Sequence, residues 1–242
     1  MKSVVISTII FMLASSRLNA QTNELGSWNI LNLKYTTDDK LSFFAEAQLR
    51  SLKLYSDFHY YEYKAGANYK VHKNAAFAIC AGSYQTYKEG GDFVLPKNNN
   101  EFRVWSQMTL FQSLSSLKIE QRYRTEFRFT SNGYRNRFRY RLGLSYPFGS
   151  EVNKKYKPYQ LNVSNELFFT TKEPYFERNR LLLAFSYKPS QPITLQVGYL
   201  RQFDYKINDE TGRNFLQIGF YLDLFRKPSA VANNNGAEIK DN

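Results

Sequence analysis

Arginine recurs at every second position in two neighbouring stretches of the chain. Residues 117–129 carry Arg122, Arg124 and Arg128 on one face, and residues 134–146 carry arginine at 135, 137, 139 and 141. A β-strand sends successive side chains to opposite faces, so each stretch has one charged face and one apolar or aromatic face. A Thr-Ser-Asn-Gly turn at 130–133 separates the two stretches. The pair therefore predicts a β-hairpin that presents a row of guanidinium groups.

Other stretches repeat this alternation, most clearly 41–50, 101–112, 160–170 and 178–188. Together they predict one shared charged face, whose candidate anion-binding residues are Arg50, Arg103, Arg122, Arg124, Arg128, Arg135, Arg137, Arg139, Arg141, Arg178 and Arg180. The same face also holds Lys118, Glu46, Glu62, Glu101, Glu120, Glu126 and Glu166. Like charges that oppose each other across a strand pair are destabilising, so facing glutamates, water or a bound anion must offset them.

The direction in which the charged face points decides the class of protein. In a water-soluble sandwich it would lie in solvent, whereas in an outer-membrane barrel the apolar face meets lipid and the charged face lines the lumen. The start of the chain favours the barrel, because Lys2, the apolar run 4–14 and the small-residue site before Gln21 are typical of a secretory signal peptide. The rival interpretation, a membrane anchor, needs about 20 apolar residues. We therefore predict a signal peptide at 1–20 and an outer-membrane location.

The composition agrees with this class. Aromatic residues make up 17% of the chain although the mean hydropathy is −0.53, a combination that suits alternating transmembrane strands. The formal charge of +12 favours anionic partners such as lipopolysaccharide or small anions, and nucleic acid is not expected for an exported chain. Cys80 is the single cysteine, which excludes a disulfide framework. No metal-ligand cluster or phosphate-binding loop indicates a cofactor.

Eleven segments have the pattern of strands: 28–35, 40–50, 58–71, 75–87, 101–112, 117–129, 134–146, 159–170, 177–188, 193–205 and 214–225. Single-chain bacterial barrels have an even number of strands, so we expect twelve, with ten as the alternative. Either 28–35 lies outside the wall or one strand is hidden. The predicted fold is all-β, a single antiparallel transmembrane barrel over 21–225, followed by a disordered polar tail at 226–242.

The predicted connections alternate in length. The segments 36–39, 71–74, 113–116 and 189–192 are short, and 51–57, 88–100, 170–176 and 206–213 are longer. Short periplasmic turns and longer outer loops are typical of outer-membrane barrels, and the long connection 147–158 departs from the rule. The last segment, which closes on Phe225, resembles the terminal-strand signal that the outer-membrane assembly machinery reads. The expected partners are thus this machinery, outer-membrane lipid and lipopolysaccharide.

Several short motifs carry a family resemblance. Trp28-Asn29, Gln-Leu-Arg at 48–50, and the arginine-rich segments 120–124 and 137–141 resemble the domain-of-unknown-function family numbered 2490. The resemblance would cover most of residues 24–225. It implies an outer-membrane β-barrel, and it brings no activity or site residues to this sequence.

Three functions fit these patterns. The first is a narrow channel whose arginine-lined lumen favours small anionic solutes, because charged rings set the selectivity of pores. The second is a closed structural or partner-binding barrel whose lumen is filled by arginine–glutamate pairs. The bases on the charged face outnumber the acids two to one, which favours the channel. The third is a small-barrel lipid-modifying enzyme with His59 beside a serine such as Ser42 or Ser83, but nothing marks a nucleophile, so we expect no enzyme.

Overall fold

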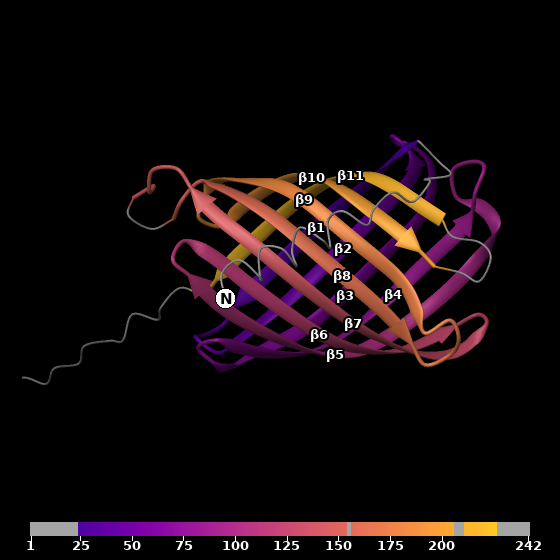
Figure 1. Ribbon diagram of the computed structural model, residues 1–242, viewed down its shortest axis with the longest axis horizontal. Coiled ribbons are helices and arrows are strands. Elements are labelled where there is room, and N and C mark those ends of the chain that lie inside the picture. Colours follow the sequence, from indigo (N-terminus) through magenta and orange to yellow (C-terminus); the bar gives the residue numbers. More distant parts are fainter. Residues whose placement is uncertain (1–23, 154–155, 206–210, 227–242) are drawn as a thin grey trace, which may run out of the picture.

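Eleven β-strands in the described part of the chain form one closed barrel (Figure 1). The computed structural model describes residues 24–153, 156–205 and 211–226, and no helix there is long and apolar enough to cross a membrane. The strands are β1 (Leu25–Thr36), β2 (Leu41–Lys53), β3 (Ser56–His72), β4 (Ala75–Lys88), β5 (Val94–Leu114), β6 (Leu117–Thr130), β7 (Gly133–Phe148), β8 (Tyr159–Thr170), β9 (Phe176–Ser190), β10 (Ile193–Asp204) and β11 (Thr211–Phe225). The predicted signal peptide at 1–20 lies outside the described residues, as does the predicted tail at 226–242 apart from Arg226.

The strand count corrects the expectation of twelve or ten strands. The segment 28–35 belongs to the wall as part of β1, which pairs with β2 on one side and with β11 on the other. Because the number of strands is odd, β1 and β11 run in the same direction and their ladder is parallel, from Leu25 opposite Asn214 to Thr36 opposite Phe225. A parallel ladder satisfies the backbone groups of both edge strands as well as an antiparallel one does, so closure does not require an even number.

The strands alternate as the sequence predicts, and the apolar face points outward. On β7, Phe138 is 43% exposed and Leu142 is 37% exposed, whereas Arg137 is 3% exposed and Arg139 is 8% exposed. The same outward band continues around the barrel through Leu33, Phe43, Ile79, Phe102, Phe127, Leu161, Leu183, Val197 and Phe220. Exposed apolar side chains therefore surround a charged interior, which is the reverse of the arrangement in a water-soluble sandwich.

The best-packed side chains lie inside the barrel against its wall. One cluster joins Tyr60, Cys80, Tyr84 and Trp105 with Ala78. A second cluster, of Trp28, Leu200 and Phe215, bridges the parallel seam, where Trp28 and Phe215 meet edge to face with ring centroids 5.5 Å apart. These aromatic side chains tie neighbouring strands together from the inside and give the charged residues ring faces on which to stack.

The connections are less asymmetric than predicted. At the end where β1 finishes they span 37–40, 73–74, 115–116, 149–158 and 191–192; at the other end they span 54–55, 89–93, 131–132, 171–175 and 205–210. The expected long connection 51–57 is a two-residue turn. The expected loop 88–100 is mostly strand, because β5 begins at Val94 and pairs with the end of β4. Gly133, with a φ of +100°, closes the predicted turn between β6 and β7 in a conformation that favours glycine.

The register of the parallel seam can be tested by cross-linking. In a Cys80→Ala background, we expect oxidation to join Leu33→Cys to Leu222→Cys, because these outward-facing residues are register partners. The control is Leu33→Cys with Phe220→Cys, on the same face but one pair further along, where the Cα atoms are too far apart for a disulfide. The chain that carries the disulfide is detected by its changed mobility on a non-reducing gel. Equal cross-linking of both pairs, or none of either, would contradict the seam.

Candidate functional site

The interior of the barrel contains a cavity of about 1230 Å³ that is lined by side chains from all eleven strands. Fourteen lysines and arginines and nine aspartates and glutamates line it, so bases exceed acids by five within the described residues. All eleven arginines of the predicted set are among the lining residues. Lys118 is not, because it lies at the rim as the second residue of β6 and is exposed.

The register of β6 and β7 creates the repulsion that the sequence implies. Arg124 lies opposite Arg139, Arg122 opposite Arg141, and Arg128 opposite Arg135. Directly opposed like charges destabilise a strand pair unless counter-charges lie between them. The carboxylates that offset this repulsion come both from the hairpin itself and from the strands beside it.

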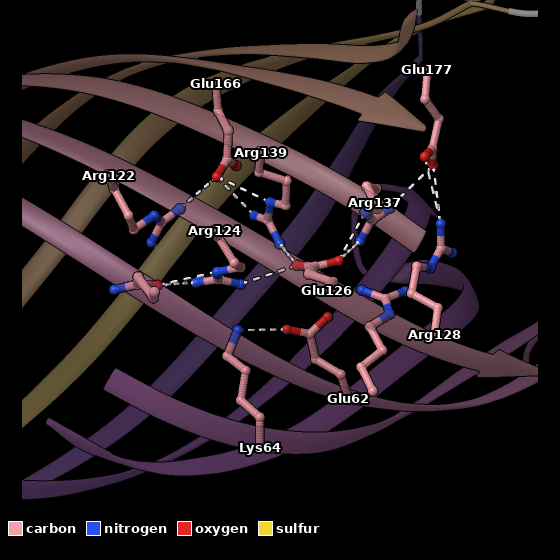
Figure 2. Close-up of polar contacts among 12 residues, drawn as sticks. Glu62, Lys64, Arg122, Arg124, Glu126, Arg128, Arg137, Arg139, Glu166 and Glu177 are labelled. Atoms are coloured by element: carbon pink, nitrogen blue, oxygen red, sulfur yellow. Dashed lines mark hydrogen bonds and ion pairs between the residues drawn. The ribbon is translucent and has the colours of Figure 1, made fainter. Parts of the chain in front are cut away.

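Glu126 is the centre of the charged network (Figure 2). Its side chain is fully buried, and one carboxylate oxygen accepts hydrogen bonds from Nε and Nη2 of Arg137 at 2.8 and 2.6 Å. The other oxygen accepts from Nη1 of Arg139 at 2.7 Å and from Nη1 of Arg124 at 3.4 Å. One buried carboxylate thus serves three guanidinium groups, and these charge-assisted bonds are the strong kind.

Further carboxylates extend the network across β5, β8 and β9. Glu166 bonds Arg139 at 2.8 Å and Arg122 at 2.5 Å. Glu177 contacts Arg137 at 3.1 Å and Arg128 at 3.5 Å (Figure 2). Glu101 in turn bonds Arg128 and Arg103, at 2.5 and 2.6 Å. From Glu101 to Arg122 the charges alternate without a break, so five strands of the wall are linked through side chains.

A second, smaller group sits on β2 and β3. Lys64 bonds Glu46 at 2.6 Å and Glu62 at 2.7 Å, and Glu62 also bonds Arg50 at 3.0 Å. The two glutamates and Arg50 belong to the charged face predicted from the sequence, but Lys64 was not among the predicted residues. The signal was present, because Lys64 is two residues from Glu62 and must share its face.

Sequence reasoning also missed two carboxylates that pair with the predicted arginines. Glu177 bonds Arg137 and Arg128, and Asp204 forms an ion pair with Arg178. Arg141 pairs with the predicted Glu120. Nine of the eleven predicted arginines thus form an ion pair with a described carboxylate, and Arg135 and Arg180 do not.

Rings inside the barrel hold several of these guanidinium groups. Cζ of Arg50 lies 3.4 Å from the Trp28 ring centroid, and Cζ of Arg103 lies 3.6 Å from that of Tyr84. Stacking on an aromatic face stabilises a cation and also fixes the plane of the guanidinium. Arg50 and Arg103 are therefore each held both by a carboxylate and by an aromatic ring.

Comparison with known proteins places the chain in a family. Residues 25–213 match the family model described as "Protein of unknown function (DUF2490)". The chain belongs to this family. The match confirms the resemblance seen in the short motifs, and its span covers the wall from β1 into β11. Searches of the curated proteins and of the solved structures gave no match.

The histidine and serines considered for a lipid enzyme are not brought together in this DUF2490 barrel. The register places Ser42 opposite Asn68 and Ser83 opposite Tyr63, so neither serine faces His59. Nδ1 of His59 is buried without a hydrogen-bond partner among the described residues. A serine nucleophile needs a base within hydrogen-bond reach, and these two pairs do not supply that geometry.

Removing the central carboxylate tests the network. We expect Glu126→Gln to lower the free energy of unfolding by about 3–5 kcal/mol, because three buried guanidinium groups lose their shared counter-charge. The matched control is Glu120→Gln, which removes a single, partly exposed partner of Arg141 and should cost less than about 1 kcal/mol. Urea unfolding in detergent micelles, followed by tryptophan fluorescence, measures both. Equal losses in the two variants would argue against Glu126 as the hub.

Proposed function

We propose that this DUF2490 protein is an outer-membrane β-barrel that forms a narrow channel favouring small anionic solutes. The observation that carries the proposal is the combination of an apolar outer wall with a hollow interior whose described lining has five more bases than acids. An apolar outside suits lipid, and a positively biased interior attracts anions.

The outer wall supports the membrane location. The strands have 12 to 21 residues, more than the roughly 9–11 that a tilted strand needs to cross a bilayer. Several exposed tyrosines lie toward the two ends of the barrel: Tyr55, Tyr134 and Tyr175 at one end, and Tyr35, Tyr69 and Tyr146 at the other. Two aromatic girdles that flank an apolar band are typical of outer-membrane barrels. Lipid and lipopolysaccharide would then contact the wall, with the outer-membrane assembly machinery as the partner during insertion.

The charges that line the lumen support the proposal that anions pass in preference to cations. Arg135 and Lys172 line the mouth at one end, where they are exposed and have no ion pair with a described residue. Unpaired charges at a mouth raise the local concentration of oppositely charged solutes, while charges along the lumen set selectivity. Inner side chains narrow the bore, so we expect only small solutes to pass.

The second candidate is a closed barrel with a structural or partner-binding role. It is favoured by one observation, the ion pairs that nine of the eleven predicted arginines form. Paired charges of this kind could fill a lumen instead of conducting. Conductance separates the two candidates, because a closed barrel passes no ions.

Channel activity and its selectivity can be measured in planar lipid bilayers. We expect discrete conductance steps and, in a salt gradient, a reversal potential that indicates preference for anions. The double variant Arg135→Glu with Lys172→Glu brings the lining to twelve bases and eleven acids, and it should lose most of that preference. A control of equal charge change, Lys70→Glu with Lys88→Glu, alters exposed residues that do not line the cavity. The absence of any conductance would favour the closed barrel, and a cation preference in the unaltered protein would refute the proposal.

The membrane location predicts a position-dependent cost of charge on the outer wall. Leu183 on β9 is 57% exposed and Leu54 in the β2–β3 turn is 53% exposed. In a bilayer, Leu183→Arg should cost about 2–4 kcal/mol and Leu54→Arg about 0–1 kcal/mol, because only the first lies within the apolar band. Unfolding from lipid vesicles measures this difference. If the wall instead faced water, both variants would be tolerated equally.

A further inference from the structure

Arg180 on β9 is the inner arginine whose charge is least compensated. Its Nε donates a hydrogen bond to Oε1 of Gln202 at 2.8 Å, and its Cζ lies 4.8 Å from the ring centroids of both Trp28 and Phe168. No described carboxylate lies within ion-pair distance of it, and no described residue accepts a hydrogen bond from Nη1 or Nη2. The two terminal nitrogens are therefore left as donors on a side chain that lines the cavity.

Arg50, whose guanidinium group stacks on the same Trp28 indole ring, also has a hydrogen-bond donor without an acceptor. Cζ of Arg50 is 3.4 Å from the Trp28 centroid, so Trp28 contacts both guanidinium groups. Arg50 is 8% exposed, and its Nη2 bonds Glu62 and Gln48, yet its Nε is buried with no hydrogen-bond partner. Buried donors in folded proteins are nearly always satisfied, and an unsatisfied one calls for a water or ion as partner.

The surroundings leave the local charge positive. Phe168 is fully buried, and the guanidinium groups of Arg137, Arg139, Arg178 and Arg180 all lie over its ring, at Cζ-to-centroid distances of 5.2, 4.5, 5.7 and 4.8 Å. The first three are paired with Glu126, Glu166 or Asp204. Arg180 alone among them keeps an uncompensated charge, and the low dielectric of the interior strengthens its attraction for an anion.

We propose that Arg180 and Arg50, held against Trp28, form an oxyanion-binding site inside the barrel for the free carboxylate or phosphate group of a small solute. The planar guanidinium fork matches two oxygens of such a group, which a spherical chloride ion cannot offer. Gln202 fixes the orientation of Arg180 through Nε and leaves the outer edge of the fork for the ligand. The proposal rests on the proposed function only in requiring that solutes reach the lumen.

The two tryptophans of the chain supply a local reporter. Trp105→Phe leaves Trp28 as the sole tryptophan, in contact with both arginines of the site. The full chain carrying this change is folded in detergent micelles and titrated with sodium phosphate, and separately with sodium acetate, against sodium chloride at constant ionic strength. We expect a saturable change in Trp28 fluorescence with phosphate, with acetate or with both, and none with chloride alone. The oxyanion that saturates at the lower concentration identifies the preferred group.

Matched variants then locate the site. Arg180→Gln should weaken binding about tenfold or more, the value typical of a lost charge-assisted hydrogen bond. Lys88→Gln removes one positive charge from an exposed residue that does not line the cavity, and it should leave the titration unchanged. Arg180→Lys keeps the charge but loses the fork, so it should bind with intermediate strength, and it serves as the test if the glutamine variant does not fold. Circular dichroism checks the fold of each.

The outcomes separate this inference from the channel proposal. Saturable, Arg180-dependent binding without conductance would support the site and refute the channel. Conductance with no saturable signal for either oxyanion would refute the site while the channel stands. A signal that Arg180→Gln or Arg180→Lys leaves at full strength would also overturn the assignment, because binding would then lie elsewhere in the lumen.

Discussion

Buried carboxylates make an arginine-rich barrel interior possible. The register of β6 and β7 sets Arg122 and Arg124 directly opposite Arg141 and Arg139, and an uncompensated row of this kind would drive the strands apart. Glu126 bonds both members of the opposed pair Arg124 and Arg139, and Glu166 bonds Arg122 and Arg139. Some of the ion pairs also connect strands that are not consecutive in the chain, such as Arg122–Glu166 between β6 and β8 and Arg128–Glu177 between β6 and β9.

Aromatic rings complete this arrangement and explain why the interior stays hollow. Arg50 stacks on Trp28 and Tyr60, Arg103 on Tyr84, and these rings belong to the wall. Stacking on a ring of the wall fixes the plane of each guanidinium group. Long side chains can therefore line the cavity of about 1230 Å³ without filling it. The surplus of positive charge is concentrated where pairing is incomplete, at the mouth near Arg135 and beside Trp28 at Arg180.

The parallel seam places the first and last residues of the wall at opposite ends of the barrel, whereas an even number of strands would place them at the same end. Because β1 and β11 run in the same direction, the wall begins at Leu25 at one end of the barrel and finishes at Phe225 at the other. Trp28 and Phe215 pack across this junction, so the aromatic cluster that contacts Arg50 and Arg180 also joins the two edge strands.

The sequence by itself determined the strands, the division of each into a charged and an apolar face, and the family. These features are local, because the side chains of a strand alternate whatever the strand pairs with, and all eleven predicted arginines consequently line one cavity. The sequence did not determine how the barrel closes. The direction of the strands at the seam depends on contacts between residues some 190 positions apart, such as Leu25 and Asn214. Nor did it determine which arginines are neutralised. Arg180 and Arg178 occupy equivalent positions on β9, yet only Arg178 meets a carboxylate, Asp204, because barrel geometry alone decides which side chains of neighbouring strands come within reach.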